Sequence, residues 1–384
     1  MELFDVYPLY DLKPVRGQGA YVYDENGRAY LDFYGGHAVI SIGHSHPHYV
    51  QRIAEQLQKL AFYSNSIHND LQAELALKLG ELSDCADYRL FLCNSGAEAN
   101  ENALKIASFE NGRQKVIAFK RAFHGRTSAS VRITENLSIQ APINQGFPVE
   151  FLPLNDLDAV EAQLKQGDVA AVIVEGIQGI GGIYLPEPAF LQGLQQLCRQ
   201  YDAVFILDEI QSGYGRSGKF FAFQHAAGVE PDLITVAKGM GNGFPIAGVL
   251  IHPRFKAKHG MLGTTFGGSH LACAAGLAVL EVIRKENLVA NAAKMGQLLL
   301  EGLHHLPGIQ AVRGVGLMIG VDFESPTGPL RKKLLFEQYL FTGSASNPNT
   351  IRLLPALNIS PVETELFLER FAKALETQAT SIPA

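Results

Sequence analysis

The sequence predicts an α/β protein, with a large domain built on an open, mostly parallel sheet and a smaller α+β domain. Short apolar runs recur through the middle of the 384-residue chain, and amphipathic stretches such as 187–200 separate several of them. Runs that are apolar throughout, rather than alternating, are typical of parallel strands buried on both faces. The predicted strands are 89–92, 115–119, 169–174, 203–207, 233–237 and 248–251.

The segment before this alternation predicts a β-hairpin followed by helices. Two runs of aromatic and aliphatic residues, 21–23 and 29–33, flank Asp24-Glu25-Asn26-Gly27, a turn sequence that favours two adjacent antiparallel strands. After His44 the apolar residues take helical spacing, which predicts helices over 50–61 and 71–82.

The C-terminal third predicts the smaller α+β domain. A long helix over 271–285 leads into it, 315–323 and 350–354 are expected strands, and 361–377 is an expected closing helix. The Ser-, Asn- and Pro-rich stretch 343–349 is typical of a surface turn. We therefore expect an N-terminal segment of the small domain (1–66), a large domain (67–279) and a C-terminal small domain (280–384).

Composition argues against several classes of partner. The net charge is −6 and the pI is near 6.1, without the basic excess typical of proteins that bind nucleic acid or anionic membranes. Four scattered cysteines, none in a C-x-x-C pair, are expected to be reduced thiols. The first residues do not resemble a secretory signal, and no apolar run reaches bilayer length. We expect a cytoplasmic protein.

An acid and a lysine end two buried strands. Asp208 follows 203–207 and Lys238 follows 233–237. A lysine can form a Schiff base with an aldehyde, and an acid can keep a pyridine nitrogen protonated, which are the two needs of pyridoxal phosphate chemistry. Asp208 and Glu209 could also bind a metal or cap a helix, and most lysines lie on the surface. The glycine-rich backbone after Lys238 and the matching acid favour the cofactor interpretation.

A helix start offers a phosphate site. Asn94-Ser95-Gly96-Ala97 follows the strand 89–92 and opens a predicted helix, whose first N–H groups are free to bind phosphate oxygens. An ordinary helix cap would explain this motif alone equally well. The motif gains weight from Asp208 and Lys238.

Five motifs in one order resemble the class III, fold type I pyridoxal phosphate-dependent aminotransferases, most closely the acetylornithine/succinylornithine type. The motifs are NSGAEANE (94–101), FHGRT (123–127), DEIQSG (208–213), AKG (237–239) and TTFGG (264–268). The resemblance covers nearly the whole chain, from GQGAY at 17–21 to IRLLP at 351–355. It implies a large cofactor-binding α/β domain, an aminotransferase activity and a place in arginine biosynthesis.

The resemblance also implies a role for each matched position. Lys238 is expected to bond to the cofactor aldehyde and to move protons, and Asp208 to pair with the pyridine nitrogen. The other implied contacts are Ser95, Gly96 and Ala97 to the phosphate, Phe123 and Ile210 on the two ring faces, Gln211 to the ring hydroxyl, and Thr265 from a second subunit. A homodimer is therefore expected, since one subunit would have an incomplete site.

Two arginines are expected to select the substrate, because the planar guanidinium suits carboxylates. By resemblance, Arg126 binds the carboxylate far from the reacting carbon and Arg352 the one beside it, which fits 2-oxoglutarate and glutamate. An N-acylornithine, acetyl or succinyl, would place its terminal amine at the cofactor and its carboxylate on Arg126. Each arginine could instead form a surface ion pair.

The chain departs from the family pattern at two positions. Relatives usually carry a glutamate where Ile180 stands, and an isoleucine cannot cover Arg352 with an opposite charge. We therefore expect the enzyme to depend on N-acylation of its donor, because an acylated α-nitrogen cannot react with the cofactor. His37 stands where relatives commonly have an apolar residue, and it is expected to alter the acyl pocket.

Other interpretations stay open. Ornithine or 4-aminobutyrate transamination, aminomutase chemistry, and a catalytically silent binding module would share the same motifs. His44, His46 and His48 alternate in a way that suits metal ligation. His44 and His46 fall in a turn motif shared with the family, however, and we expect no metal site.

Overall fold

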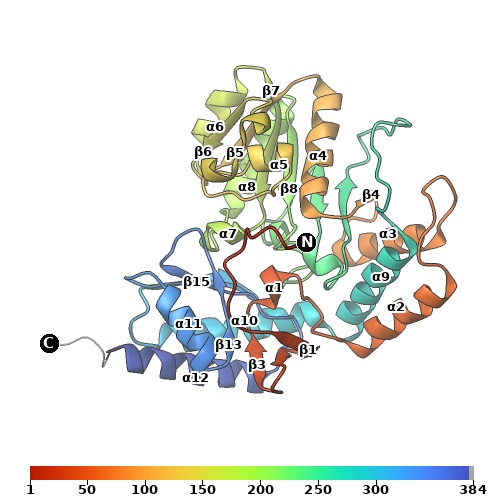
Figure 1. The fold of residues 1–384 in the computed structure, drawn as a ribbon. Helices are drawn as coiled ribbons and strands as arrows, with labels where there is room; N and C mark the ends of the chain where they lie inside the picture. Colours follow the sequence, from red (N-terminus) through yellow and green to blue (C-terminus); the bar gives the residue numbers. More distant parts are fainter. Residues whose placement is uncertain (380–384) are drawn as a thin grey trace.

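The computed structural model describes residues 1–379, and its centre is a seven-stranded sheet in the order β4-β10-β9-β8-β7-β5-β6 (Figure 1). The strands are β4 (Arg89–Cys93), β5 (Lys115–Phe119), β6 (Val149–Leu152), β7 (Val169–Glu175), β8 (Val204–Asp208), β9 (Leu233–Val236) and β10 (Ala247–Ile251). The sequence predicts all of these except β6. That strand lies at the sheet edge with only Leu152 fully buried, so it lacks the continuous apolar run of its neighbours.

The predicted α/β class with a mostly parallel sheet is confirmed, with one exception. β8 pairs in parallel with β7 and β9, and β5 pairs in parallel with β6 and β7. β10 runs antiparallel to both of its neighbours, β4 and β9. The expectation that 248–251 is a parallel strand is therefore wrong. A continuous apolar run indicates that a strand is buried, but a buried strand can run parallel or antiparallel to its neighbours.

Helices cover both faces of this sheet. α4 (Gly96–Asn111) and α5 (Ser128–Arg132) lie on one face, and α8 (Pro188–Gln200) and α6 (Leu157–Leu164) lie on the other. Alternate residues of β7 enter two cores: Ala171 and Ile173 join the α4 side, and Val172 and Val174 join the α8 side. Because both faces are covered, a ligand has access only at the ends of the strands.

Two smaller sheets join the beginning and the end of the chain. β1 (Pro14–Gln18), β2 (Tyr21–Asp24) and β3 (Ala29–Asp32) form the predicted hairpin region, and β13 (Leu340–Phe341) adds to β3 in parallel. The other sheet has the order β11-β12-β15-β14, with β11 (Ala311–Val315), β12 (Met318–Asp322), β15 (Thr350–Leu353) and β14 (Gly343–Ser344). The shared sheet supports our division into 1–66, 67–279 and 280–384, which we keep as a proposal.

Two expectations for the C-terminal region are corrected. The segment 315–323 is not one strand, because β11 ends at Val315 and the chain turns at Gly316, whose φ of 56° is left-handed, before β12 begins. The stretch 343–349 is only partly a surface turn: Gly343 and Ser344 form β14 and pair with β15.

The remaining helices confirm the periodicity argument. The predicted helices correspond to α2 (Pro47–Lys59), α3 (Asp70–Ser83), α9 (His270–Lys285) and α12 (Pro361–Ala379). Four more complete the fold: α1 (Gly35–Ala38), α7 (Gly179–Gly182), α10 (Leu288–His304) and α11 (Gly328–Glu337). Within residues 1–379, no helix has the length and apolar character needed to cross a bilayer.

Candidate active site

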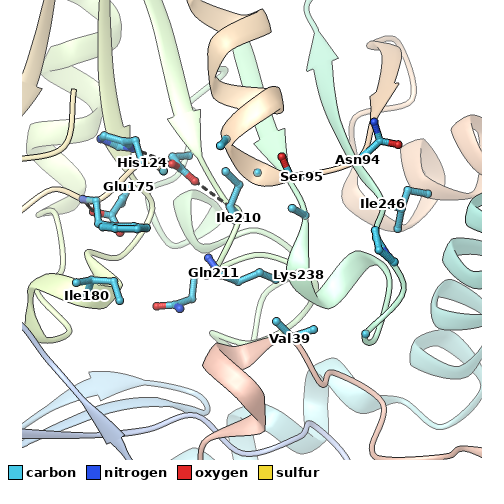
Figure 2. A pocket seen from close by; sticks show the side chains of 18 of the residues that line it. Val39, Asn94, Ser95, His124, Glu175, Ile180, Ile210, Gln211, Lys238 and Ile246 are labelled. Atoms are coloured by element: carbon cyan, nitrogen blue, oxygen red, sulfur yellow. Dashed lines mark hydrogen bonds and ion pairs between the residues drawn. The ribbon is translucent and has the colours of Figure 1, made fainter. Parts of the chain in front are cut away.

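The loops that follow β4, β5, β7, β8 and β9 meet at the carboxyl edge of the sheet and enclose a cavity of about 290 Å³. These loops belong to parallel strands, so their first residues lie at the same edge. The cavity wall includes Ser95 and Lys238 (Figure 2). It also includes Phe123, from the loop after β5, and Asp208, the last residue of β8. The structure thus brings these four residues together around one cavity.

Lys238 lies two residues after the end of β9 and lines this cavity. Its backbone has a φ of 45°, a left-handed conformation that is strained for a residue with a side chain. No hydrogen bond or ion pair of its amine occurs within the described chain. Burial lowers the pKa of Lys238, while the charges of Asp208 and Glu175 oppose that shift. The site therefore favours a neutral, nucleophilic amine.

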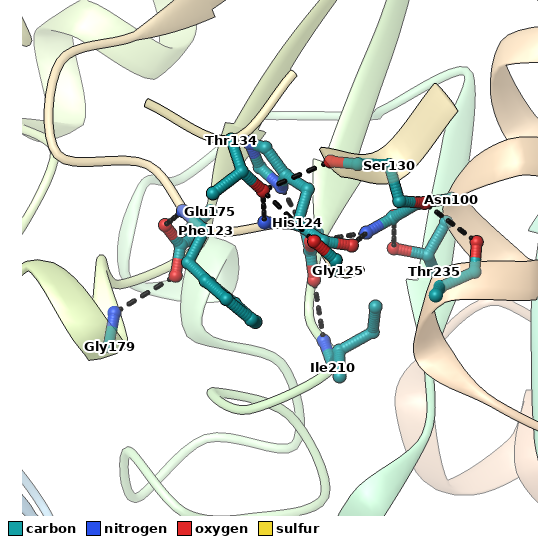
Figure 3. A network of polar contacts seen from close by, with 12 residues as sticks. Asn100, Phe123, His124, Gly125, Ser130, Thr134, Glu175, Gly179, Ile210 and Thr235 are labelled. Carbon is teal, nitrogen blue, oxygen red and sulfur yellow. Dashed lines mark hydrogen bonds and ion pairs between the residues drawn. The ribbon is translucent and has the colours of Figure 1, made fainter. Parts of the chain in front are cut away.

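Asp208, the last residue of β8, is only 4% exposed and lines the same cavity. Its Oδ2 accepts hydrogen bonds from Asn100 Nδ2 at 2.8 Å and His124 Nδ1 at 2.7 Å. Among residues 1–379, its Oδ1 accepts only the backbone N–H of Ile210, at 3.0 Å. Figure 3 shows this buried polar network. Oδ1 therefore keeps acceptor capacity for a donor on a ligand.

The N-terminus of α4 supplies the predicted anion site. Ser95 is the N-cap, and its hydroxyl oxygen accepts from the N–H of Glu98 at 3.2 Å. The backbone N–H groups of Gly96 and Ala97 have no hydrogen-bond partner in the described chain and border the cavity. A 16-residue helix with free first N–H groups attracts a phosphate group. The cap interpretation and the phosphate interpretation are thus compatible.

Apolar residues and glycines shape the cavity walls. Phe123 and Ile210 both line it, as predicted from the ring-stacking roles. A Cβ on Gly96 would lie 2.9 Å from the Ile210 side chain, so only glycine permits this close packing of α4 on the β8 loop. Gln211 also lines the cavity, but its amide already donates to the carbonyl oxygen of His37 at 3.0 Å.

Three residues of the network were missed as functional candidates. His124 and Asn100 lie inside quoted motifs, and Glu175 follows a predicted strand at its carboxyl end, which was the available signal. Glu175 accepts from the N–H groups of Phe123 at 3.0 Å and Gly179 at 2.9 Å. Burial raises the pKa of Glu175 to about 7. This carboxyl therefore fixes two loops that carry pocket residues.

Glu209 is structural in this fold, although it follows Asp208 directly. Its Oε2 accepts from Ser212 Oγ at 2.7 Å and from the N–H of Ala222 at 3.0 Å, and its Oε1 accepts from the N–H of Phe223 at 2.9 Å. Burial raises the pKa of Glu209 to about 7. The two consecutive acids therefore do not form a metal-binding pair.

The two predicted substrate arginines have different environments. Arg352, on β15, is 1% exposed; its Nε donates to the carbonyl oxygen of Ser344 and its guanidinium to Gln211 Oε1 at 3.3 Å. Burial lowers the pKa of Arg352 to about 10. Within the described chain no carboxylate lies within ion-pair distance of it. Arg126 is exposed, has no hydrogen bond or ion pair there, and does not line the cavity.

Three more predicted positions surround the cavity. Ile180 lines it, and Ser346 fixes the Ile180 carbonyl oxygen through its N–H at 2.8 Å and its hydroxyl at 3.0 Å. His37 is exposed in α1, where its φ is 69°, and its ring contacts the Tyr34 hydroxyl. Thr265 is exposed and does not line the cavity of its own subunit.

The three alternating histidines bind separate acids. His44 contacts Asp32 at 2.9 Å. His46 contacts Glu286 at 2.9 Å, and His48 contacts Glu281 at 2.6 Å. These contacts tie the turn to β3 and to the end of α9. Across residues 1–379, no group of three or more His, Cys, Asp or Glu is arranged to hold a metal ion.

The groups that line the cavity match those that pyridoxal phosphate requires. It combines an amine without a partner at Lys238, a carboxylate oxygen with free capacity at Asp208, and free helix N–H groups at Gly96 and Ala97. These are the partners that an aldehyde, a pyridine nitrogen and a phosphate require. Phe123 and Ile210 supply apolar surfaces suited to a flat ring.

Comparison with known proteins identifies the family. The Aminotransferase class-III model matches residues 6–375. Acetylornithine aminotransferase from Bacillus subtilis is 39% identical over 97% of both chains, and the one from Archaeoglobus fulgidus is 42% identical over 92% of this chain and 93% of that one. Ornithine aminotransferase from Toxoplasma gondii superposes with a TM-score of 0.91 at 30% identity, covering 98% of this chain and 93% of that one. The chain belongs to the class-III aminotransferases and is a pyridoxal phosphate-dependent transaminase.

Proposed function

We propose that this enzyme moves the terminal amine of an N-acylornithine, acetyl or succinyl, to 2-oxoglutarate. The proposal rests on the guanidinium of Arg352, which is buried and has no carboxylate within ion-pair distance in the described chain. This guanidinium donates a hydrogen bond to Gln211, which lines the cavity. Burying a cation without an opposite charge is costly, so a carboxylate-bearing substrate is the natural partner. The relatives named acetylornithine aminotransferase from Bacillus subtilis and Archaeoglobus fulgidus support the donor.

Each step of the reaction has a residue suited to it. When bound, pyridoxal phosphate accepts the donor's amine and withdraws electrons from the reacting carbon. Lys238 would move a proton at that carbon, because burial lowers the pKa of its amine and so favours the neutral form. Asp208 would hold the ring nitrogen through Oδ1. The apolar walls formed by Phe123 and Ile210 exclude water from the reacting centre.

The two arginines would read two different carboxylates. We assign Arg352 the carboxylate beside the reacting carbon of glutamate and 2-oxoglutarate, and Arg126 the distant one. Arg126 lies in the loop that follows β5. Phe123 and Gly125 of the same loop line the cavity. Because Arg126 is exposed and unpaired within the described chain, its guanidinium is available to turn toward a substrate.

The absence of an acid at Ile180 would decide which amine of a donor reacts. Arg352 would stay open to an α-carboxylate, since no carboxylate of the described chain pairs with it and the wall residue Ile180 is apolar. Free ornithine would therefore bind with its α-carboxylate on Arg352 and react partly at its α-amine. An acylated α-nitrogen cannot react, so acylation would direct the enzyme to the terminal amine.

A side-by-side half-reaction tests the donor. The purified holoenzyme is mixed with N-acetylornithine, N-succinylornithine, ornithine or 4-aminobutyrate, and the cofactor spectrum and the product are followed. We expect fast, clean terminal transamination of an acylated donor, and slower, mixed products from ornithine. Clean terminal transamination of ornithine at the same rate would contradict the role given to Ile180. Preference for 4-aminobutyrate would favour the alternative activity, and no bleaching by any amine would favour a silent binding module.

We further propose a homodimer in which Thr265 completes the partner's site. Thr265 is exposed beside Phe266, which is 62% exposed and contacts Phe62 with ring centroids 5.4 Å apart. α2, close to this surface, has no fully buried residue, and Leu57 and Leu60 are exposed. An apolar surface of this kind is typical of a subunit interface.

A mixing experiment tests the crossing of Thr265. We expect Lys238→Ala and Thr265→Glu subunits to be inactive alone, the second because its charge would repel the phosphate. If Thr265 crosses, a mixed dimer regains one intact site, with Lys238 from one subunit and Thr265 from the other. We expect up to half of the wild-type activity per mixed dimer. No regain in mixed dimers confirmed by mass would place Thr265 in its own subunit's site.

A further inference from the structure

Asn100 uses every polar atom of its side chain to join three elements behind the cavity. It is 0% exposed on α4, and its Nδ2 donates to Asp208 Oδ2 and to the carbonyl oxygen of His124, each at 2.8 Å. Its Oδ1 accepts from Thr235 Oγ1, also at 2.8 Å (Figure 3). Thr235 is likewise 0% exposed, and β9 pairs it with Asp208.

The Thr235 hydroxyl determines how tightly this amide is held. A side-chain amide presents donors on one side and an acceptor on the other, so reversing it exchanges their partners. In the reversed orientation the Asn100 oxygen would face the Asp208 carboxylate, and two acceptors would lose their donor. Without the Thr235 hydroxyl, the Asn100 oxygen would be buried with no donor, and the orientation would lose one of its three anchors.

Asn100 acts on one oxygen of Asp208 and leaves the other free. Oδ2 is held by Asn100 and by His124, whereas Oδ1 accepts only the Ile210 N–H. Two short hydrogen bonds to one oxygen fix the rotation of the carboxylate, and they are strong in a buried site. The orientation of Oδ1 therefore depends on two successive hydrogen bonds, from Thr235 to Asn100 and from Asn100 to Asp208.

We propose that Asn100 and Thr235 are positioning residues that hold Asp208 so that its free oxygen meets the cofactor's ring nitrogen. The inference rests on the role given to Asp208 under the proposed function. It adds that β9 serves both halves of the site: Thr235 fixes the acid, and Lys238, three residues later, supplies the amine.

Binding of two cofactors to the apo-protein tests this role without turnover. The first is pyridoxal phosphate and the second is its analogue with carbon in place of the ring nitrogen. The wild type should prefer the natural cofactor by about tenfold or more, the worth of a charge-assisted hydrogen bond. Thr235→Val, of nearly the same shape, should lose most of this preference, and Thr235→Ser, which keeps the hydroxyl, should retain it.

Two further measurements separate positioning from simple packing. In the Thr235→Val holoenzyme, kcat should fall about tenfold with KM within about twofold, because the interaction strengthens in the transition state. The apparent pKa of the bound chromophore should rise by about one unit, the size of a typical local perturbation, because a poorly held ring nitrogen withdraws electrons less. Asn100→Asp keeps the shape but removes the N–H donor, and it should show the same pattern if Thr235→Val does not fold.

The outcomes are distinct. If Thr235→Val and Thr235→Ser behave alike, or if Thr235→Val weakens both cofactors equally, the two residues only support packing and the inference is overturned. If the wild type itself binds both cofactors equally, the role of Asp208 fails, and this inference fails with it. That last result is recognised from the wild type alone, before any variant is measured.

Discussion

The floor and the rim of the cavity are built differently. The floor contains a buried hydrogen-bond network in which Asp208 and Asn100 are bonded through all their side-chain polar atoms, while His124 Nε2 has no partner among the described residues. What we call the rim lies outside the cavity wall and carries two arginines without an opposite charge in the described chain, the buried Arg352 and the exposed Arg126. A buried hydrogen-bond network holds its side chains in one geometry, whereas a guanidinium without an opposite charge is available to bind an anionic ligand. The floor should therefore serve every substrate, and the rim should distinguish among them.

Replacing Lys238 should give the largest loss of activity, and the loss should be the same for every substrate. Lys238→Ala is expected to lower kcat by more than roughly 10⁴-fold with every donor, because general acid–base catalysis alone contributes 10²–10⁴. Noncovalent cofactor binding should survive. Single-turnover spectra with N-acetylornithine and with glutamate, together with mass analysis after reduction, would measure both properties. Near wild-type turnover would refute the assignment.

Asp208→Asn should give the next largest effect, again equal for all substrates. We expect kcat to fall roughly 10²–10³-fold, the range found when one preorganised electrostatic partner is removed. The cofactor's ring nitrogen would lose its charged partner, while the hydrogen bonds from Asn100 and His124 could partly remain. Parallel kinetics with glutamate and an acylated ornithine provide the measurement. A variant that affected only one of the two substrates would place Asp208 on the rim instead.

Arg352→Lys should separate the two half-reactions. For glutamate we expect kcat/KM to fall by about 10- to 100-fold, since a charge-assisted hydrogen bond contributes about 1.5–3 kcal/mol and lysine cannot form the bidentate contact. The acylated donor should change much less, because its carboxylate is assigned to Arg126. Arg126→Lys is the matched control and should impair both substrates. Equal losses in Arg352→Lys would remove the division of labour between the arginines.

Glu209→Gln should give the smallest change in activity and an effect on stability instead. Burial raises the pKa of Glu209 from 4.5 to about 7, so the folded state holds a proton that the unfolded state has lost between these values. The stability that this carboxyl contributes is complete below pH 4.5 and is lost as the pH rises to about 7. Glutamine cannot titrate, so unfolding free energies measured over this pH range should decline less steeply in the variant. An unchanged slope would contradict the raised pKa.

Local sequence was sufficient for the floor. One apolar strand ends at Asp208 and another ends two residues before Lys238, and parallel strands bring their carboxyl ends to one edge. Ser95 was predictable for the same reason, because it joins β4 to the first turn of α4. His124 and Glu175 were within reach of the same rule, since each follows a strand of this sheet, but a single sequence does not reveal which partners their side chains meet.

Contacts between distant segments were not predictable. The direction of β10 depends on its pairing with β4, more than 150 residues earlier, and Arg352 is held by Ser344 from a stretch that reads as a surface turn. The hydrogen bond from Thr235 to Asn100 joins positions 135 residues apart. Such contacts follow from packing of whole elements, which periodicity along the chain does not encode.

The amino-acid sequence by itself determined the buried strands of the large sheet and the acid and lysine that lie at or just beyond two of their ends, because burial and strand termination are properties of neighbouring residues. Tertiary structure alone decided which oxygen of Asp208 stays free, which arginine is buried and which is exposed, and that Asn100 and Thr235 stand behind the site. Those features depend on side chains brought together from separate elements, and their hydrogen bonds exist only once the fold has formed.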